Sequence, residues 1–78
     1  MTTREEAKAQ CNKAMFNALT GGSMAYKVEH SEFDVDNVVK RTMDVRVDSE
    51  SQQQTWARMW TIFDEEWRRY ELLPRVHP

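Results

Sequence analysis

The fold is decided by residues 55–70, TWARMWTIFDEEWRRY, in which large apolar side chains recur at steps of three or four. A helix places side chains with this spacing on a single face about 100° wide. The members of this face are Trp56, Met59, Trp60, Phe63, Trp67 and Tyr70. Because the face gathers all three tryptophans of the chain, we expect it to be the centre of the hydrophobic core, with Trp60 and Phe63 at its middle.

The ends of this helix have sequence signals of their own. Ser49 and Gln52 form a capping-box pattern, in which the first side chain accepts a hydrogen bond from the backbone three residues later. Pro74 cannot continue a helix, because it lacks a backbone N–H. We therefore predict a helix over 49–72, followed by a frayed tail over 73–78.

A second helix is predicted near the start of the chain, over residues 4–20. Thr3 and Glu6 again have the spacing of a capping box. Small apolar residues follow at helical spacing: Ala7, Cys11, Ala14 and Ala18. The pair Gly21-Gly22 supplies the backbone freedom that a helix end requires. Phe16 points away from the alanines, so either the buried face is centred near Met15 and Leu19, or Phe16 is exposed for a partner.

Between the two helices, residues 23–48 alternate with a period of two, which indicates strands with one buried face. One alternating set contains Met24, Tyr26 and Val28, and another contains Met43, Val45 and Val47. Phe33 and Val35 also alternate, before a possible turn at Asp36-Asn37. Two arrangements remain open: a hairpin with a long connection, or three short strands.

These elements predict an α+β fold in one small domain over 1–78, because 78 residues are enough for a single core. The expected order is α-β-β(β)-α. Two helices would pack on one face of a small antiparallel sheet of two or three strands, which buries both the aromatic stripe and the apolar side of each strand.

The sequence does not contain the residue sets that most catalytic mechanisms need. Cys11 lies among small apolar residues, so we expect a buried and chemically quiet thiol. His30 and His77 are the only histidines. The sequence has no glycine-rich phosphate loop, no Ser-His-Asp set and no calcium-loop pattern around Asp34 and Asp36. We predict that the protein is not an enzyme and that it uses no metal and no cofactor.

The charge distribution argues against direct contact with nucleic acid or with membranes. The net charge is −2, and no segment concentrates lysine and arginine without neighbouring carboxylates. No apolar run approaches the roughly 20 residues that span a bilayer, and the polar start does not have the pattern of a signal peptide. We expect a cytoplasmic protein of the host cell, as a monomer or a homodimer.

The stretch EHSEFDVD, residues 29–36, is the feature that folding explains least. Its four carboxylates, without a lysine or arginine among them, concentrate negative charge on one side of the molecule. One interpretation is a solvated surface. The other is a docking patch for a basic protein surface, with aromatic anchors beside it. The candidate binding residues are Glu29, Glu32, Asp34 and Asp36, with Phe33 and Tyr26 as the anchors.

Two resemblances point to a phage or another mobile element. The opening MTTREEA, residues 1–7, with the helix ending LTGG, residues 19–22, is similar to the small head-completion proteins of tailed phages, which have an α-β-β-α plan. This similarity covers the first third of the chain, and the tryptophan-rich helix and the missing basic tail depart from it. The size, the acidic patch and the absent catalytic set resemble phage-encoded anti-CRISPR inhibitors in type, without a shared motif.

The function expected from these features is inhibition without catalysis. The protein would bind a host protein complex with a basic surface, such as a CRISPR-Cas effector that binds nucleic acid, and would occlude that surface. Two alternatives remain: a structural protein of the phage head–tail junction, and a small regulator associated with transcription. The resemblance in type carries no individual residue over to this chain.

Overall fold

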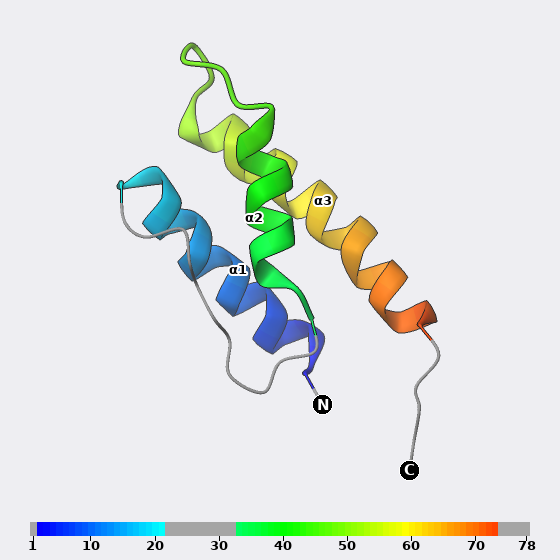
Figure 1. The fold of residues 1–78 in the computed structure, drawn as a ribbon. Coiled ribbons are helices and arrows are strands. Elements are labelled where there is room, and N and C mark those ends of the chain that lie inside the picture. The colour runs from blue at the N-terminus through cyan, green and yellow to red at the C-terminus, as the bar shows by residue number, and fades with distance from the viewer. Residues whose placement is uncertain (1, 22–32, 74–78) are drawn as a thin grey trace.

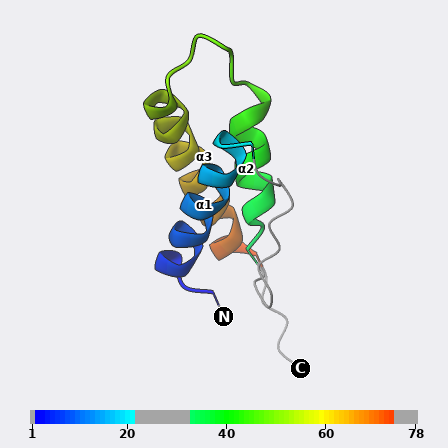
Figure 2. The ribbon, with the colours of Figure 1, turned by 90° about the vertical axis from the view of Figure 1, so that its left-hand side faces the viewer.

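Three helices form the described part of the chain, which in this computed structural model comprises residues 2–21 and 33–73 (Figure 1). Helix α1 spans Arg4–Leu19, α2 spans Val35–Asp44 and α3 spans Gln52–Leu72. Figures 1 and 2 show α1 and α2 running in the same direction, with α3 antiparallel to both. The described residues are therefore an all-α bundle without a strand.

The predicted α+β fold is wrong. Residues 35–44, which the prediction placed in the sheet, form α2. Val45 and Val47 are 61% and 59% exposed, although a strand with one buried face would have covered both. The other predicted strand, over Met24–Val28, lies outside the described residues.

The spacing of the apolar residues explains why α2 is a helix. The buried residues Val35, Val38, Val39 and Thr42 stand at i, i+3, i+4 and i+7, which is the pattern of one helical face. The side chain of Asp34 caps the helix, since it accepts a hydrogen bond of 3.1 Å from the backbone N–H of Asn37. Packing of this face overrides the preference of valine for strands.

The predicted first helix is confirmed, with its ends close to those expected. The Thr3 side chain caps α1 by accepting a hydrogen bond of 3.1 Å from the backbone N–H of Glu6. Gly21 has a φ of +79°, a left-handed conformation that glycine adopts at little cost. Met15 is fully buried while Phe16 is 59% exposed. The buried face of α1 thus runs through Ala7, Cys11, Ala14 and Met15, and Phe16 is exposed to solvent.

The aromatic helix is confirmed too, but its predicted start at residue 49 lies three residues before the observed start at Gln52. The capping box forms between Ser51 and Gln54, and the Gln54 side chain accepts a hydrogen bond from the Ser51 backbone in return. Ser49 lies instead in a turn, which is closed by a backbone hydrogen bond of 3.0 Å from the N–H of Glu50 to the carbonyl of Val47. Helix α3 begins only after this turn.

The core lies where the three helices meet, and aromatic rings fill its centre. Phe33, directly before the α2 cap, is 4% exposed. Its ring centroid lies 5.4 Å from that of Phe63 and 5.3 Å from that of Trp67. Edge-to-face and tilted contacts of this kind stabilise aromatic clusters beyond the area they bury. The other buried apolar residues are Ala7, Cys11, Ala14, Met15, Val35, Val38, Val39, Met59, Ile62 and Tyr70.

Two of the stripe's tryptophans lie at the α1–α3 seam and are only partly buried. The indole N–H of Trp56 donates a hydrogen bond of 2.9 Å to Asn12 on α1. The ammonium of Lys8 lies 5.5 Å from the ring centroid of Trp60. Trp60 therefore packs against the core without being enclosed in it. The centre of the stripe is Phe63, which is fully buried.

Candidate functional site

An acidic surface runs along α2 and into the turn that follows it. We define the acidic face as four exposed aspartates, Asp34, Asp36, Asp44 and Asp48. None of the four forms an ion pair with another described residue. Asp36 and Asp44 stand eight residues apart on the same exposed side of the helix, with Lys40 between them. The face therefore keeps a net negative charge, because four carboxylates surround a single lysine that is unpaired among the described residues.

The arginines of the same segment are paired with glutamates, so they do not neutralise the acidic face. Arg41 reaches across to α3, where it forms ion pairs of 2.7 Å with Glu66 and 3.0 Å with Glu65. Arg46 turns toward Glu50, at 3.8 Å. Lys40 is then the one cation between Asp34 and Asp48 that forms no ion pair with a described residue. In this segment, four exposed aspartates thus form no ion pair with a described residue, while both arginines are paired.

Of the site residues predicted from the sequence, some are exposed, one is buried and the others lie outside the described residues. Asp34 and Asp36 lie at the exposed start of α2, as part of the acidic face. Glu29, Glu32 and Tyr26 lie outside the described residues. Phe33 lies in the core, so the aromatic anchor proposed there is not at the surface. Asp44 and Asp48 were missed, because residues 43–48 were assigned to a strand.

Asp44 occupies a position in its own helix where a negative charge is unfavourable. It is the last residue of α2, where the unpaired carbonyls give the helix end a partial negative charge. Asp36, in contrast, lies in the first turn, where a carboxylate is stabilising. Helix stability therefore explains Asp36 but opposes Asp44. A carboxylate at such a position suggests a role outside folding.

Exposed apolar side chains adjoin the acidic face at its end. Val45 follows Asp44 and caps the C-terminus of α2, and Val47 precedes Asp48 in the turn. Both valines are more than half exposed. Apolar groups flanked by charge are typical of protein–protein contacts, where the apolar part loses water and the charged rim steers the encounter.

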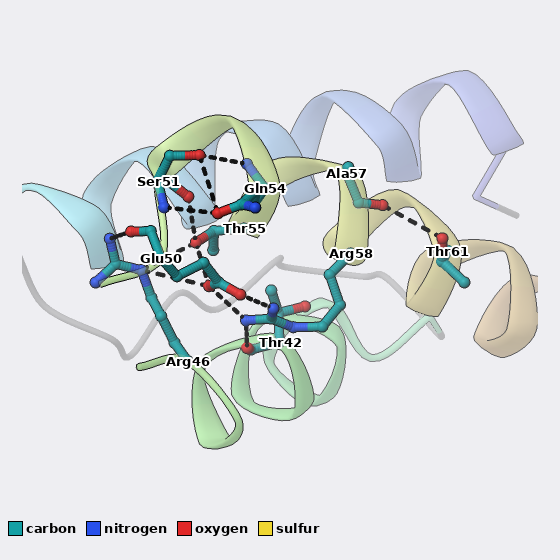
Figure 3. Close-up of polar contacts among 9 residues, drawn as sticks. All are labelled: Thr42, Arg46, Glu50, Ser51, Gln54, Thr55, Ala57, Arg58 and Thr61. Atoms are coloured by element: carbon teal, nitrogen blue, oxygen red, sulfur yellow. Dashed lines mark hydrogen bonds and ion pairs between the residues drawn. The ribbon is translucent and has the colours of Figure 1, made fainter. Parts of the chain in front are cut away.

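A partly buried polar network joins this turn to α3 (Figure 3). The carboxylate of Glu50 accepts hydrogen bonds from both terminal nitrogens of Arg58 and one of 2.6 Å from the hydroxyl of Thr55. Arg46 donates a hydrogen bond of 2.9 Å from Nε to the Thr55 hydroxyl. Arg58 also donates to the carbonyl oxygen of Thr42, at 2.8 Å. The network therefore connects the end of α2, the turn and the start of α3.

The same network sets the ionisation of Glu50. Hydrogen bonds from Arg58 and then from Thr55 lower the pKa of Glu50 from 4.5 to about 2. The carboxylate is consequently charged throughout the neutral and mildly acidic range. Its charge is committed to Arg58 and Arg46, so Glu50 supports the turn and does not belong to the acidic face.

The one cysteine of the chain is shielded from solvent. The thiol of Cys11 is fully buried, and this burial raises its pKa to about 12. A protonated, shielded thiol is a poor nucleophile. Within residues 2–21 and 33–73, no three His, Cys, Asp or Glu side chains are grouped so that they could hold a metal ion. In that same part of the chain, no helix combines the length and hydrophobicity needed to cross a bilayer.

A surface hollow at the other end of the bundle is a weaker candidate site. Its lining includes Arg4, Asp64, Trp67, Arg68 and Glu71. Arg4 and Asp64 already pair with each other at 2.7 Å, and the remaining two charges are opposite. The hollow therefore offers no net charge to a ligand, unlike the acidic face.

Comparison with known proteins identifies no relative. A scan against protein-family profiles, a search of curated proteins and a search of solved structures all find no match.

Proposed function

We propose that the protein is a non-catalytic inhibitor, encoded by a phage or a mobile element, that binds a basic surface of a host protein complex. The observation that supports this function is the segregation of charge on α2. The aspartates of the acidic face are exposed and form no ion pair with described residues, whereas Arg41 and Arg46 are paired with glutamates. A surface of this kind attracts a basic partner, increases the association rate and makes binding depend on salt.

The proposed target is a CRISPR-Cas effector that binds nucleic acid in the host cytoplasm. Such effectors hold their nucleic acid in a positively charged channel, mainly through contacts to the backbone. Carboxylates held on a helix can occupy the same cations that contact phosphates. The protein would then act by occlusion, so that it needs neither a cofactor nor direct contact with nucleic acid.

Asp44 strengthens this proposal, because folding does not account for it. At the end of α2 its carboxylate opposes the helix dipole by roughly 0.3–1 kcal/mol. A basic partner would compensate for this cost in the complex.

The test compares two double charge reversals against a panel of purified CRISPR-Cas effector complexes. D44K/D48K reverses two members of the acidic face. E5K/E71K is the matched control, because it reverses two exposed carboxylates on α1 and α3 that also form no ion pair with described residues. Both variants shift the net charge from −2 to +2, so an effect of net charge alone would be equal in the two.

We expect wild type to bind an effector, with affinity that falls as salt rises. D44K/D48K should bind at least about tenfold more weakly, which corresponds to about 1.4 kcal/mol. E5K/E71K should stay within about threefold of wild type, and circular dichroism should show that both variants are folded. Equal weakening in the two variants, or binding to no effector, would contradict the proposal.

A further inference from the structure

The turn between α2 and α3 presents two apolar side chains on a rigid support. Its outward residues are Val45, at 61% exposure, and Val47, at 59%. Both lie between Asp44 and Asp48 in the sequence. Large apolar side chains that stay exposed contribute little to folding, so their position requires another explanation.

The residues next to these valines are anchored. Arg46 and Glu50 turn inward, with side chains only 26% and 12% exposed. Backbone hydrogen bonds of 3.1 Å, from the N–H of Arg46 to the carbonyl of Met43, and of 3.0 Å, from the N–H of Glu50 to that of Val47, hold the turn as well. Figure 3 shows Arg46 and Glu50 joined to Thr55 and Arg58 on the side of α3.

This anchoring reduces what binding would cost. A flexible loop loses conformational entropy when a partner fixes it, whereas a turn held in advance loses much less. Apolar side chains on a preorganised turn are therefore efficient contacts. Val45 and Val47 are exposed, and so are the neighbouring Asp44 and Asp48.

We infer that Val45 and Val47 are the apolar contact of the acidic face, and that the partner is a protein surface with an apolar pocket flanked by lysine or arginine. This inference rests on the proposed function, and it adds which residues bind and what the bound surface looks like. Asp44 and Asp48 flank the valines in the sequence, so a complementary partner has lysine or arginine around its apolar pocket. Nucleic acid does not fit, because its phosphates would be repelled by both aspartates.

The experiment measures binding of V45S/V47S to the effector complex that the panel above identifies. F16S/L72S is the matched control, because Phe16 and Leu72 are exposed apolar residues away from the turn, at 59% and 78%. We expect V45S/V47S to bind at least tenfold more weakly at low and at high salt, with F16S/L72S within about threefold of wild type. The isosteric pair V45T/V47T, which keeps the shape of both side chains, should weaken binding in the same direction.

The outcomes separate the inference from the proposed function. If D44K/D48K weakens binding and V45S/V47S does not, the acidic face binds without the valines and the inference is wrong. If F16S/L72S weakens binding as much as V45S/V47S, the contact is not specific to the turn, and the inference is again wrong. If no effector binds, the proposed function fails and the inference fails with it.

Discussion

Arg58 of α3 donates a hydrogen bond of 2.8 Å to the carbonyl oxygen of Thr42 in the last turn of α2. The final carbonyls of a helix have no partner within the helix, so this guanidinium supplies one of the missing donors. Arg58 also holds Glu50 in the turn between the two helices. One side chain thus fixes both sides of the segment that carries Val45 and Val47.

The Glu50 contacts predict a specific dependence of stability on pH. The pKa of Glu50 in the folded protein is lowered to about 2, mainly by Arg58. A depressed carboxyl pKa stabilises the fold above the ordinary value of 4.5, and this contribution is lost as pH falls toward 2. We expect E50Q to melt below wild type at pH 7, with the difference shrinking between pH 5 and pH 2.5. Melting curves followed by circular dichroism would test this, and a difference that stays constant would contradict it.

Alanine substitutions at Phe33 and Phe16 test where the core lies, because the first side chain is buried and the second is exposed. Phe33 is 4% exposed and contacts Phe63 and Trp67, whereas Phe16 is 59% exposed. F33A should reduce the free energy of unfolding by about 3–5 kcal/mol, because it leaves a cavity in the core. F16A should change it by less than about 0.5 kcal/mol. Urea titrations measure both, and equal losses would show that the assignment of the core is wrong.

Cys11 should react only when the protein opens. Its thiol is fully buried and its pKa is raised to about 12, so the reactive thiolate is scarce at neutral pH. We expect a thiol reagent to label Cys11 slowly in native protein and rapidly in denaturant. Labelling rates followed by mass spectrometry give the comparison. Rapid labelling of the native protein would show that the site is open.

Asp36 and Asp44 should respond in opposite directions to the same substitution. D36K removes a carboxylate from the first turn of α2 and should destabilise the protein by about 0.3–1 kcal/mol. D44K replaces a carboxylate at the helix end with a cation and should stabilise the protein by a similar amount. Urea titrations at low salt would measure both changes. A loss of stability in D44K would mean that Asp44 has a folding role that the structure does not show.

The sequence predicts α1 and α3 well, because their signals are local. The Thr3 cap, the glycine at the end of α1 and the aromatic stripe of α3 each depend on nearby residues only. The Ser51 cap was missed, since Ser49 and Gln52 have the same spacing as Ser51 and Gln54. Only the turn closed between Val47 and Glu50 distinguishes these two starts.

The sequence does not predict α2 because two different periods follow each other within a short segment. Met43, Val45 and Val47 alternate as a strand would, while Val35, Val38, Val39 and Thr42 have helical spacing. The Asp34 cap was the signal that could have decided between them. Ion pairs between helices could not be predicted from the sequence, because Arg41 contacts Glu66 only when α2 and α3 are packed together.

Competition with nucleic acid tests the central claim most directly. A purified CRISPR-Cas effector that binds this protein is loaded with fluorescently labelled target nucleic acid, and the protein is then titrated in while anisotropy is recorded. Occlusion of a basic channel predicts that wild type releases the label completely, that E5K/E71K does so at a similar concentration, and that D44K/D48K requires at least about tenfold more. An effector that holds the protein and the labelled nucleic acid at the same time would contradict the account.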